Sequence, residues 1–215
     1  MTKQQWRARL LAARRLRTDG ERRAARAAVT EHLLRALPEW ADAAGDAPVV
    51  CAFHPLPSEP LAADLPELLA GAGARVLVPV AHPHAPLDWC ELGGTTVPGM
   101  LCVPEPSGPR LGPEAIRTAD VMLLPALAVD AAGVRLGRGG GHYDRTLALL
   151  DPGGDEAARG RPSRAGRDGT VIRPRLIAVV FDDELVERLP RDRHDIPVTD
   201  VLTPGGGLRP VARDG

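Results

Sequence analysis

Aromatic residues are scarce in this sequence. Phe, Trp and Tyr together make up 3% of the 215 residues, and Tyr143 is the single tyrosine. Core volume must therefore come mainly from Leu, Val and Ala. With 44% hydrophobic and 26% charged residues, the chain has the composition of a globular protein and can bury a substantial core.

Cysteines are few and widely spaced. Cys51, Cys90 and Cys102 are odd in number and form no close pair, so they give neither a disulfide framework nor a zinc signature. Long apolar runs are missing as well, so no segment could span a bilayer. The first ten residues lack the apolar stretch of a signal peptide. We therefore expect a cytoplasmic protein that makes no membrane contact.

The chain also lacks an overall excess of charge. A formal net charge of −1 gives no reason to expect nucleic acid as a partner. Residues 1–40 do contain ten Lys or Arg against four Asp or Glu, interleaved with Leu, Ala and Val at helical spacing. No aromatic platform accompanies these charges, so the pattern is typical of a solvated helix face and nucleic-acid binding is not expected.

Hydrophobic periodicity predicts alternating helices and strands. Helical periods cover residues 2–37, 61–71, 143–150 and 183–189. Apolar runs typical of strands lie at 47–55, 74–81, 87–92, 119–130, 175–182 and 198–204. The run at 119–130 is too long for one strand, and Pro125 suggests a strand followed by a loop. The first helical region should break near Thr18, where Thr18 or Asp19 can cap a second helix. The order strand–helix–strand over 47–81 predicts two parallel strands, and the whole pattern indicates a layered α/β domain.

Two standard phosphate motifs are absent. The P-loop pattern GxxxxGK[ST] does not occur, and the dinucleotide pattern GxGxxG fails because His142 stands where the third glycine is needed. A nicotinamide enzyme is therefore not expected.

The stretch RLGRGGGHYDR (135–145) nevertheless meets the physical needs of a phosphate site. Its glycines let the backbone approach a ligand without hindrance from a Cβ atom. Arg135 and Arg138 supply fixed positive charge with bidentate geometry. Asp144, beside these cations, suits a hard divalent cation that bridges phosphates. The combination predicts a phosphate site with a metal.

These residues also resemble a known family. The segment LLPALAVDAAGVRLGRGGGHYDRTL (123–147) resembles the signature of the 5-formyltetrahydrofolate cyclo-ligases, also called methenyltetrahydrofolate synthetases. The segments KQQWR (3–7), FHPLPSEP (53–60), VPEP (103–106) and RHDIPVTDVLTP (193–204) follow the family order. The resemblance covers nearly the whole chain, so we expect one domain over 1–215 with a surface loop at 151–174.

The resemblance implies a fold and a reaction. The fold is a three-layer α/β sandwich with a mostly parallel central sheet, as in sugar-phosphate isomerases and CoA transferases. The reaction uses ATP to close 5-formyltetrahydrofolate, a small-molecule substrate, into 5,10-methenyltetrahydrofolate, with release of ADP and phosphate. The γ-phosphoryl group passes to the formyl oxygen, N10 attacks the activated carbon, and phosphate leaves. Such chemistry needs mainly alignment and charge neutralisation, with Mg²⁺ between the phosphates. A monomer is expected.

The resemblance also implies residue roles. Lys3 and Arg7, four residues apart on one helix face, would reach the ATP phosphates, and Arg138 would touch the transferring group. These three are the expected catalytic residues. The expected ATP-binding residues are Lys3, Arg7, Arg135, Leu136, Gly137, Arg138, Gly139, Gly140, Gly141, His142 and Tyr143.

Substrate and metal contacts follow in the same way. The expected substrate-binding residues are His54, Glu59, Arg138, Gly139, Gly140, Gly141 and His142. Glu59 would face the pterin, where a carboxylate can accept the N–H bonds of the aminopyrimidine edge. Asp144 would hold Mg²⁺, with Asp195 as a second ligand or, alternatively, a residue that caps a turn.

His142 departs from the family, which usually has Tyr or Phe at this position. It is either a loop histidine without a chemical role or, when protonated, a donor to a phosphate oxygen. The second interpretation predicts a pH dependence of activity near neutrality.

Two other functions remain open at this point. A binding-only relative would hold folate or nucleotide without turnover, but Lys3, Arg7, Arg138 and Asp144 are all present, which argues against it. A sugar-phosphate isomerase on a related fold would need a general base and no nucleotide. Dependence on ATP separates these possibilities.

Overall fold

A computed structural model describes residues 1–99, 104–150, 173–192 and 195–211 of the chain. The expected loop at 151–174 lies, apart from its last two residues, outside the described residues.

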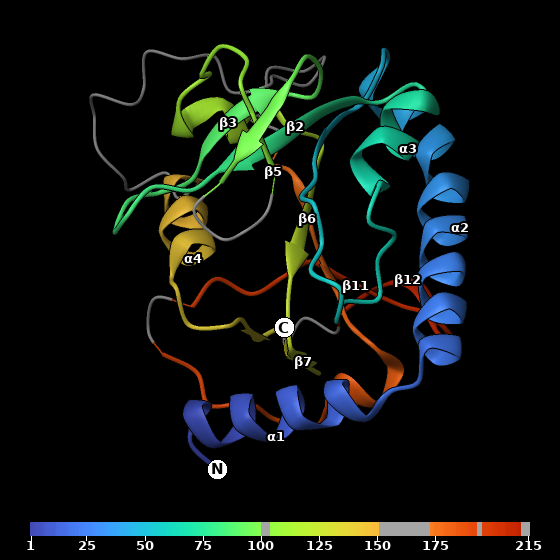
Figure 1. Cartoon of the computed structure of the whole chain (residues 1–215), viewed down its shortest axis with the longest axis vertical. Coiled ribbons are helices and arrows are strands. Elements are labelled where there is room, and N and C mark those ends of the chain that lie inside the picture. The colour runs from blue at the N-terminus through green and yellow to red at the C-terminus, as the bar shows by residue number, and fades with distance from the viewer. Residues whose placement is uncertain (100–103, 151–172, 193–194, 212–215) are drawn as a thin grey trace.

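A seven-stranded sheet forms the centre of the molecule, with strand order β12-β11-β9-β6-β1-β2-β3 (Figure 1). The strands are β1 (Val49–Cys51), β2 (Arg75–Val80), β3 (Asp88–Glu91), β6 (Val121–Pro125), β9 (Arg175–Val179), β11 (Asp200–Thr203) and β12 (Gly207–Pro210). The five inner strands are parallel, and the two edge strands, β3 and β12, pair antiparallel. The predicted parallel pair over 47–81 is confirmed, whereas β12 was not predicted.

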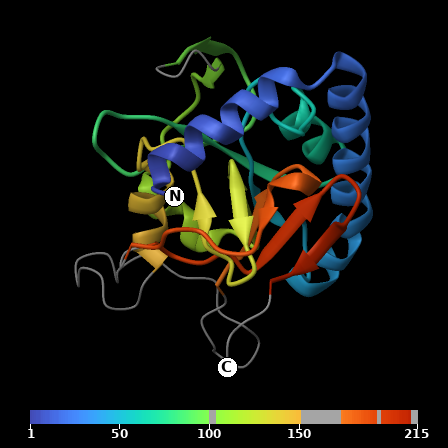
Figure 2. The same cartoon turned by 90° about the horizontal axis from the view of Figure 1, so that it is seen from below.

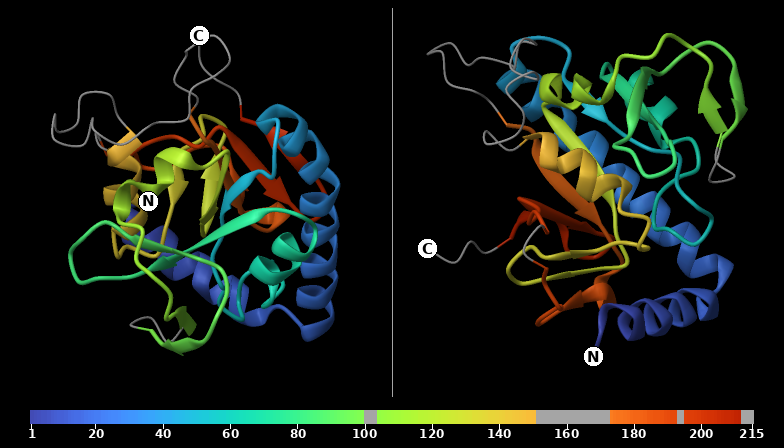
Figure 3. Two further views of the ribbon diagram at one scale, coloured as in Figure 1. Left: turned by 90° about the horizontal axis from the view of Figure 1, so that it is seen from above. Right: turned by 90° about the vertical axis from the view of Figure 1, so that its left-hand side faces the viewer.

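Helices cover both faces of this sheet (Figures 1 and 3). One face carries α2 (Asp19–Ala44) and α3 (Leu65–Gly71), and the other carries α4 (His142–Leu147) and the 3₁₀ helices η1 (Pro113–Thr118) and η2 (Ala148–Leu150). Residues along β6 alternate between the layers, as a strand's period of two requires. Leu123 packs in the cluster that contains Leu33 of α2, and Leu124 in the cluster that contains Leu147 of α4. The expected three-layer α/β fold with a mostly parallel sheet is confirmed.

The helix α1 (Lys3–Leu16) lies outside the sandwich and crosses its lower end (Figure 2). It ends before Thr18, whose side chain caps α2 in a capping box with Glu21. The break near Thr18 is therefore confirmed. Leu10 of α1 packs with Leu127, Leu136 and Leu189 around a second, three-stranded sheet. The N-terminal helix is thus fixed against the elements that follow β6.

The second sheet has the order β10-β7-β8 and corrects two expectations. Its strands are β7 (Ala128–Asp130), β8 (Arg135–Leu136) and β10 (Leu185–Val186). The apolar run at 119–130, expected as a strand followed by a loop, forms two strands, β6 and β7, which belong to different sheets. The helix predicted over 183–189 is wrong: a 3₁₀ turn η4 (Asp182–Glu184) leads into β10, because Leu185 pairs with Val129 in parallel register. Tertiary pairing thus overrides the helical period.

Two further features complete the fold. Strands β4 (Thr96–Pro98) and β5 (Pro104–Pro106) form a small antiparallel pair. Among the helices of the described residues, none is long and apolar enough to cross a bilayer.

Candidate active site

A cavity of about 320 Å³ lies at the carboxyl ends of β1, β2 and β6. Phe53 follows β1, Ala81 follows β2 and Ala126 follows β6, and all three line the cavity. Crevices at the carboxyl ends of parallel strands are the usual ligand sites of α/β sheets. The glycine-rich segment 137–141 and the first residues of α4 also line the cavity.

Most residues expected from the sequence meet in this cavity. Those that line it are His54, Glu59, Arg135, Gly137, Arg138, Gly139, Gly140, Gly141, His142, Tyr143 and Asp144. Within the described part of the chain, Lys3, Arg7, Leu136 and Asp195 do not line it. Leu136 is buried among the apolar residues under α1, so its side chain supports the segment from behind.

Two glycines of the segment have backbone conformations that require glycine. Gly139 has a φ of 102° and Gly141 a φ of 69°, both in the left-handed region. A Cβ atom on Gly139 would lie 3.3 Å from the guanidinium carbon of Arg7. On Gly141 it would lie 2.6 Å from Nη1 of Arg145. The bare backbone therefore lets two arginines approach the segment closely.

Arg7 and Lys3 reach the site from α1 in different ways. The Nε of Arg7 donates a hydrogen bond to the carbonyl oxygen of Gly137 at 3.0 Å, so Arg7 contacts the outer side of the segment. The Nζ of Lys3 lies 2.6 Å from a carboxylate oxygen of Asp195 and 2.8 Å from one of Asp192. Partial burial lowers the pKa of Lys3, but the bonds and charges of the two aspartates outweigh this and raise it above its usual value.

Asp144 and Arg135 form a tight pair on the cavity wall. The Nη2 of Arg135 lies 2.5 Å from Oδ1 of Asp144, and its Nη1 donates to the carbonyl oxygen of Pro125 at 3.1 Å. The Arg135 side chain is 5% exposed, whereas that of Asp144 is 40% exposed. Arg135 is thus a fixed charge, and Asp144 keeps carboxylate surface toward the cavity.

The donor set defines what kind of metal the site can hold. The described residues contain no group of three or more His, Cys, Asp or Glu side chains placed to bind a metal. Asp144 as a single carboxylate fits Mg²⁺, which commonly takes one or two carboxylates and completes its shell with phosphates and water. Asp195 is engaged differently, because it accepts the Asp192 N–H at 2.7 Å in a turn and pairs with Lys3.

Glu59 is a buried carboxylate that lines the same cavity. Its side chain is 6% exposed, and one oxygen accepts the Leu56 N–H at 2.9 Å. Burial raises the pKa of Glu59, and the Leu56 N–H and the charge of Arg138 only partly offset this effect. The Nε of Arg138 lies 3.8 Å from the other oxygen, and its Nη2 donates to Ser58 Oγ at 2.9 Å. Arg138 thus connects the glycine segment to the Glu59 loop.

Sequence reasoning missed the apolar wall of the cavity. This wall and its one polar neighbour comprise Phe53, Leu56, Pro79, Ala81, Leu87, Pro125, Ala126 and Glu105. Phe53 meets Tyr143 edge to face, with ring centroids 6.4 Å apart, and burial raises the pKa of Tyr143. The ends of the predicted parallel strands were the available signal, since Phe53, Ala81 and Ala126 each follow one.

Comparison with known proteins decides the family. The model of the 5-formyltetrahydrofolate cyclo-ligase family matches residues 1–204. The chain belongs to this family. It is therefore an enzyme of the ligase class, as its sequence predicted.

Cyclo-ligases from other organisms are similar over most of the chain. The cyclo-ligase of Mycolicibacterium smegmatis is 42% identical over 165 residues, which are 74% of this chain and 75% of the relative. That of Escherichia coli K12 is 31% identical over 142 residues, or 64% of this chain and 68% of the relative. The NMR structure of the Aquifex aeolicus 5,10-methenyltetrahydrofolate synthetase shares 26% identity and has a TM-score of 0.70, covering 100% of this chain and 95% of that one.

Proposed function

We propose that this cyclo-ligase uses ATP to convert 5-formyltetrahydrofolate into 5,10-methenyltetrahydrofolate, releasing ADP and phosphate. The observation that carries the proposal is a single cavity lined by two chemically different sets of residues. One set, here called the Glu59 end, comprises apolar side chains and the buried Glu59, and the other, here called the glycine end, comprises Arg135, Asp144 and the glycine segment. The names of the similar cyclo-ligases support the same substrate.

The glycine end suits a triphosphate. Glycines without side chains admit phosphate oxygens close to the backbone, and Arg135 and Arg138 supply permanent positive charge. Lys3 and Arg7 lie outside the cavity, and they would approach the phosphates from α1 after Lys3 leaves its aspartate partners. Asp144 would hold Mg²⁺, which would neutralise phosphate charge when bound.

The Glu59 end suits a pterin. Leu56, Phe53 and Tyr143 supply apolar and aromatic surface for a flat ring. The carboxylate of Glu59 is buried, and the oxygen on the side of Arg138 accepts no backbone bond from the described residues. An aminopyrimidine edge would donate N–H bonds to this carboxylate and so compensate for the lost hydration.

Arg138 belongs to the glycine segment and also lies 3.8 Å from Glu59, and this position suits phosphoryl transfer. The formyl oxygen attacks the γ-phosphorus and the bond to ADP breaks. N10 then attacks the formyl carbon, the N10 proton passes to the phosphate, and the carbon–oxygen bond breaks as hydrogen phosphate leaves. Arg138 would neutralise the charge on the transferring group, and no side chain needs to act as a nucleophile.

Absorbance of the methenyl product in the near ultraviolet tests the proposal. Purified protein with Mg-ATP and 5-formyltetrahydrofolate should develop this band, and omission of ATP should abolish it. Asp144→Asn should lower the rate at least about a hundredfold, because the phosphates lose their metal anchor. Asp42→Asn, on the exposed surface of α2, is the matched control and should leave the rate unchanged.

Calorimetry separates the possible failures. ATP binding without product formation would contradict the reaction and favour a binding-only protein or another acceptor. Absence of both product and ATP binding would overturn the assignment of the glycine segment as a phosphate site.

A further inference from the structure

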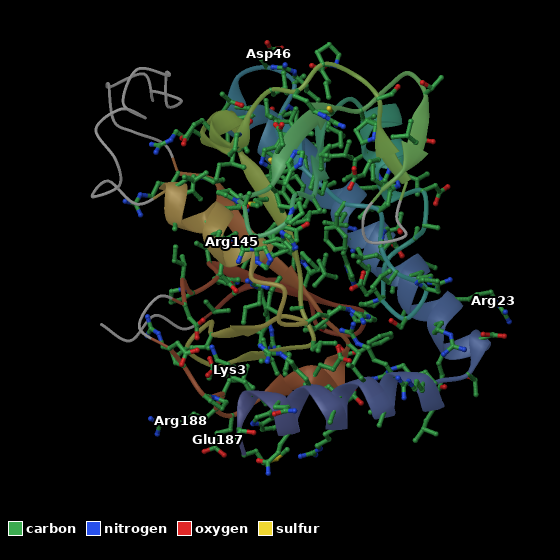
Figure 4. The ribbon with its side chains drawn as sticks, turned by 60° about the vertical axis from the view of Figure 1, so that its left-hand side comes forward. Lys3, Arg23, Asp46, Arg145, Glu187 and Arg188 are labelled. Carbon is green, nitrogen blue, oxygen red and sulfur yellow. The ribbon has the colours of Figure 1, made fainter. Side chains whose placement is uncertain are left out.

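Arg145 makes an unusual set of contacts behind the glycine segment. It lies in the second turn of α4, and its Nε donates to the carbonyl oxygen of Ala85 at 3.2 Å. Its Nη2 donates to the carbonyl oxygen of Gly140 at 3.0 Å and lies 3.4 Å from Nδ1 of His142. In Figure 4 Arg145 lies within the outline of the molecule and is partly buried, whereas Arg188 projects from the edge. One guanidinium thus joins three parts of the chain.

The guanidinium occupies space that Gly141 leaves free. A Cβ atom at Gly141 would lie 2.6 Å from Nη1 of Arg145, and Gly141 also has a positive φ. The absence of a side chain at Gly141 is therefore what allows Arg145 to lie against the segment. Gly141 therefore leaves room for the guanidinium of Arg145 as well as for a ligand in the cavity.

The contacts of Arg145 fix the orientation of the Gly140 peptide and that of the His142 ring. A peptide unit is planar and trans, so turning the Gly140 carbonyl toward Arg145 turns the N–H of Gly141 to the opposite side. Arginine has only donors, so Nδ1 of His142 must act as the acceptor in their contact. The neutral ring then carries its proton on Nε2, away from Arg145.

We propose that Arg145 is a positioning residue for nucleotide binding, acting through the Gly140 peptide and the His142 ring. The inference rests on the proposed function, because it takes the glycine segment as the ATP site. Arg145 does not line the cavity and would not touch ATP itself. Its planar fork holds the Ala85 and Gly140 carbonyls through two different nitrogens, a fixed geometry that the single ammonium nitrogen of Lys does not reproduce.

The anchoring of α4 makes the proposal testable without unfolding the protein. The N–H of Leu87 donates to Thr146 Oγ1 at 2.8 Å, and Leu147 is fully buried in the core. These contacts keep α4 in place when Arg145 is replaced. Loss of Arg145 should therefore release mainly the glycine segment.

The experiment measures Mg-ATP and 5-formyltetrahydrofolate binding by calorimetry, with the thermal midpoint of each variant. Arg145→Gln should weaken Mg-ATP binding about tenfold or more, since two bonds from a charged donor are lost. Folate affinity should change less, because the Glu59 loop holds the pterin end. Arg145→Lys keeps the charge and should still bind Mg-ATP several-fold more weakly than wild type. Arg188→Gln is the matched surface control and should bind both ligands as wild type does.

Each contrary outcome has a distinct meaning. Wild-type ATP affinity in Arg145→Gln, or full recovery in Arg145→Lys, would overturn the positioning role. Equal loss of both ligands would also overturn it, by assigning Arg145 a general structural role. If wild type itself fails to bind Mg-ATP, the proposed function fails first. If Arg145→Gln does not fold, Arg145→Lys decides the matter alone.

Discussion

The ammonium nitrogen of Lys3 lies 2.6 Å from a carboxylate oxygen of Asp195. The sequence assigned these two residues to different ligands, Lys3 to phosphate and Asp195 to Mg²⁺. Their contact shows that each at present neutralises the other, with Asp192 as a second partner of Lys3. Binding of a triphosphate by Lys3 therefore requires exchange of carboxylate for phosphate.

The positions of Asp144 and Asp195 predict that their variants differ in metal dependence. Asp144→Asn should raise the Mg²⁺ concentration needed for half-maximal activity, because Asp144 faces the cavity. Asp195→Asn should leave that concentration unchanged and instead alter the KM for ATP, because Asp195 holds Lys3. Activity measured over a Mg²⁺ series at fixed ATP distinguishes the two. A raised Mg²⁺ requirement in Asp195→Asn would identify it as a metal ligand instead.

Lys3 itself should contribute to nucleotide binding. Lys3→Ala removes one charged donor and should raise the KM for ATP by roughly tenfold, the usual scale for a charge-assisted hydrogen bond. The KM for 5-formyltetrahydrofolate should stay within about twofold, since Lys3 does not line the cavity. Steady-state kinetics with each substrate varied in turn gives both values. Gln4→Ala, an exposed neighbour on α1, is the control.

Gly139 should tolerate no side chain. Its φ of 102° and the 3.3 Å approach of Arg7 mean that Gly139→Ala strains the backbone and displaces the guanidinium. We expect about 1–3 kcal/mol of destabilisation and a loss of activity of about a hundredfold. Urea unfolding and the product assay measure the two effects. Gly71→Ala is the control, because a Cβ atom there meets nothing within 4 Å and α3 gains helix propensity.

The buried pair of Arg14 and Glu184 should hold α1 on the domain. Nε of Arg14 lies 2.7 Å from Glu184, both side chains are at most 2% exposed, and Arg14 also donates to the carbonyl oxygen of Ala126 on the cavity wall. Glu184→Ala leaves a buried charge unpaired and should cost about 3–5 kcal/mol of unfolding free energy. Removing the exposed pair of Arg75 and Glu91 should cost less than about 1 kcal/mol. Similar losses for both pairs in urea unfolding would contradict this interpretation.

Much of the fold was predictable because parallel strands buried on both faces leave continuous apolar runs. The exceptions depend on long-range pairing. The segment 183–189 has a helical period, yet Leu185 pairs with Val129 in the second sheet. Strand β12 was missed because GGGLRP is typical of a turn until β11 supplies a partner.

The site residues likewise fall into those that the sequence predicts and those that it does not. The glycine segment was predictable because its charges and glycines are contiguous in the sequence. The apolar wall was not, since Phe53, Leu87 and Ala126 come from separate strand ends and loops. The role of Arg145 depends on a carbonyl group at Ala85, 60 residues earlier, which no local pattern reveals.

Glu59 should make the stability of the protein depend on pH. Burial raises the pKa of its carboxyl above the usual 4.5 in the folded protein, so the folded state favours the protonated form. The stabilisation that comes with this proton is complete below about pH 4.5 and is lost as the pH rises through the raised pKa. Glu59→Gln removes the buried charge, and Gln can still accept the Leu56 N–H through its amide oxygen. The variant should therefore be more stable than wild type at neutral pH, and the difference should vanish in acid.

The same variant should bind folate poorly. The amide presents one acceptor and an N–H₂ group where the aminopyrimidine edge needs acceptors, so the KM for 5-formyltetrahydrofolate should rise about tenfold or more. Urea unfolding at several pH values and steady-state kinetics measure the two effects. Glu187→Gln, on the exposed surface, should change neither. If Glu59→Gln is less stable than wild type at neutral pH, the carboxylate is stabilised in the folded apoprotein and is not held there for the ligand.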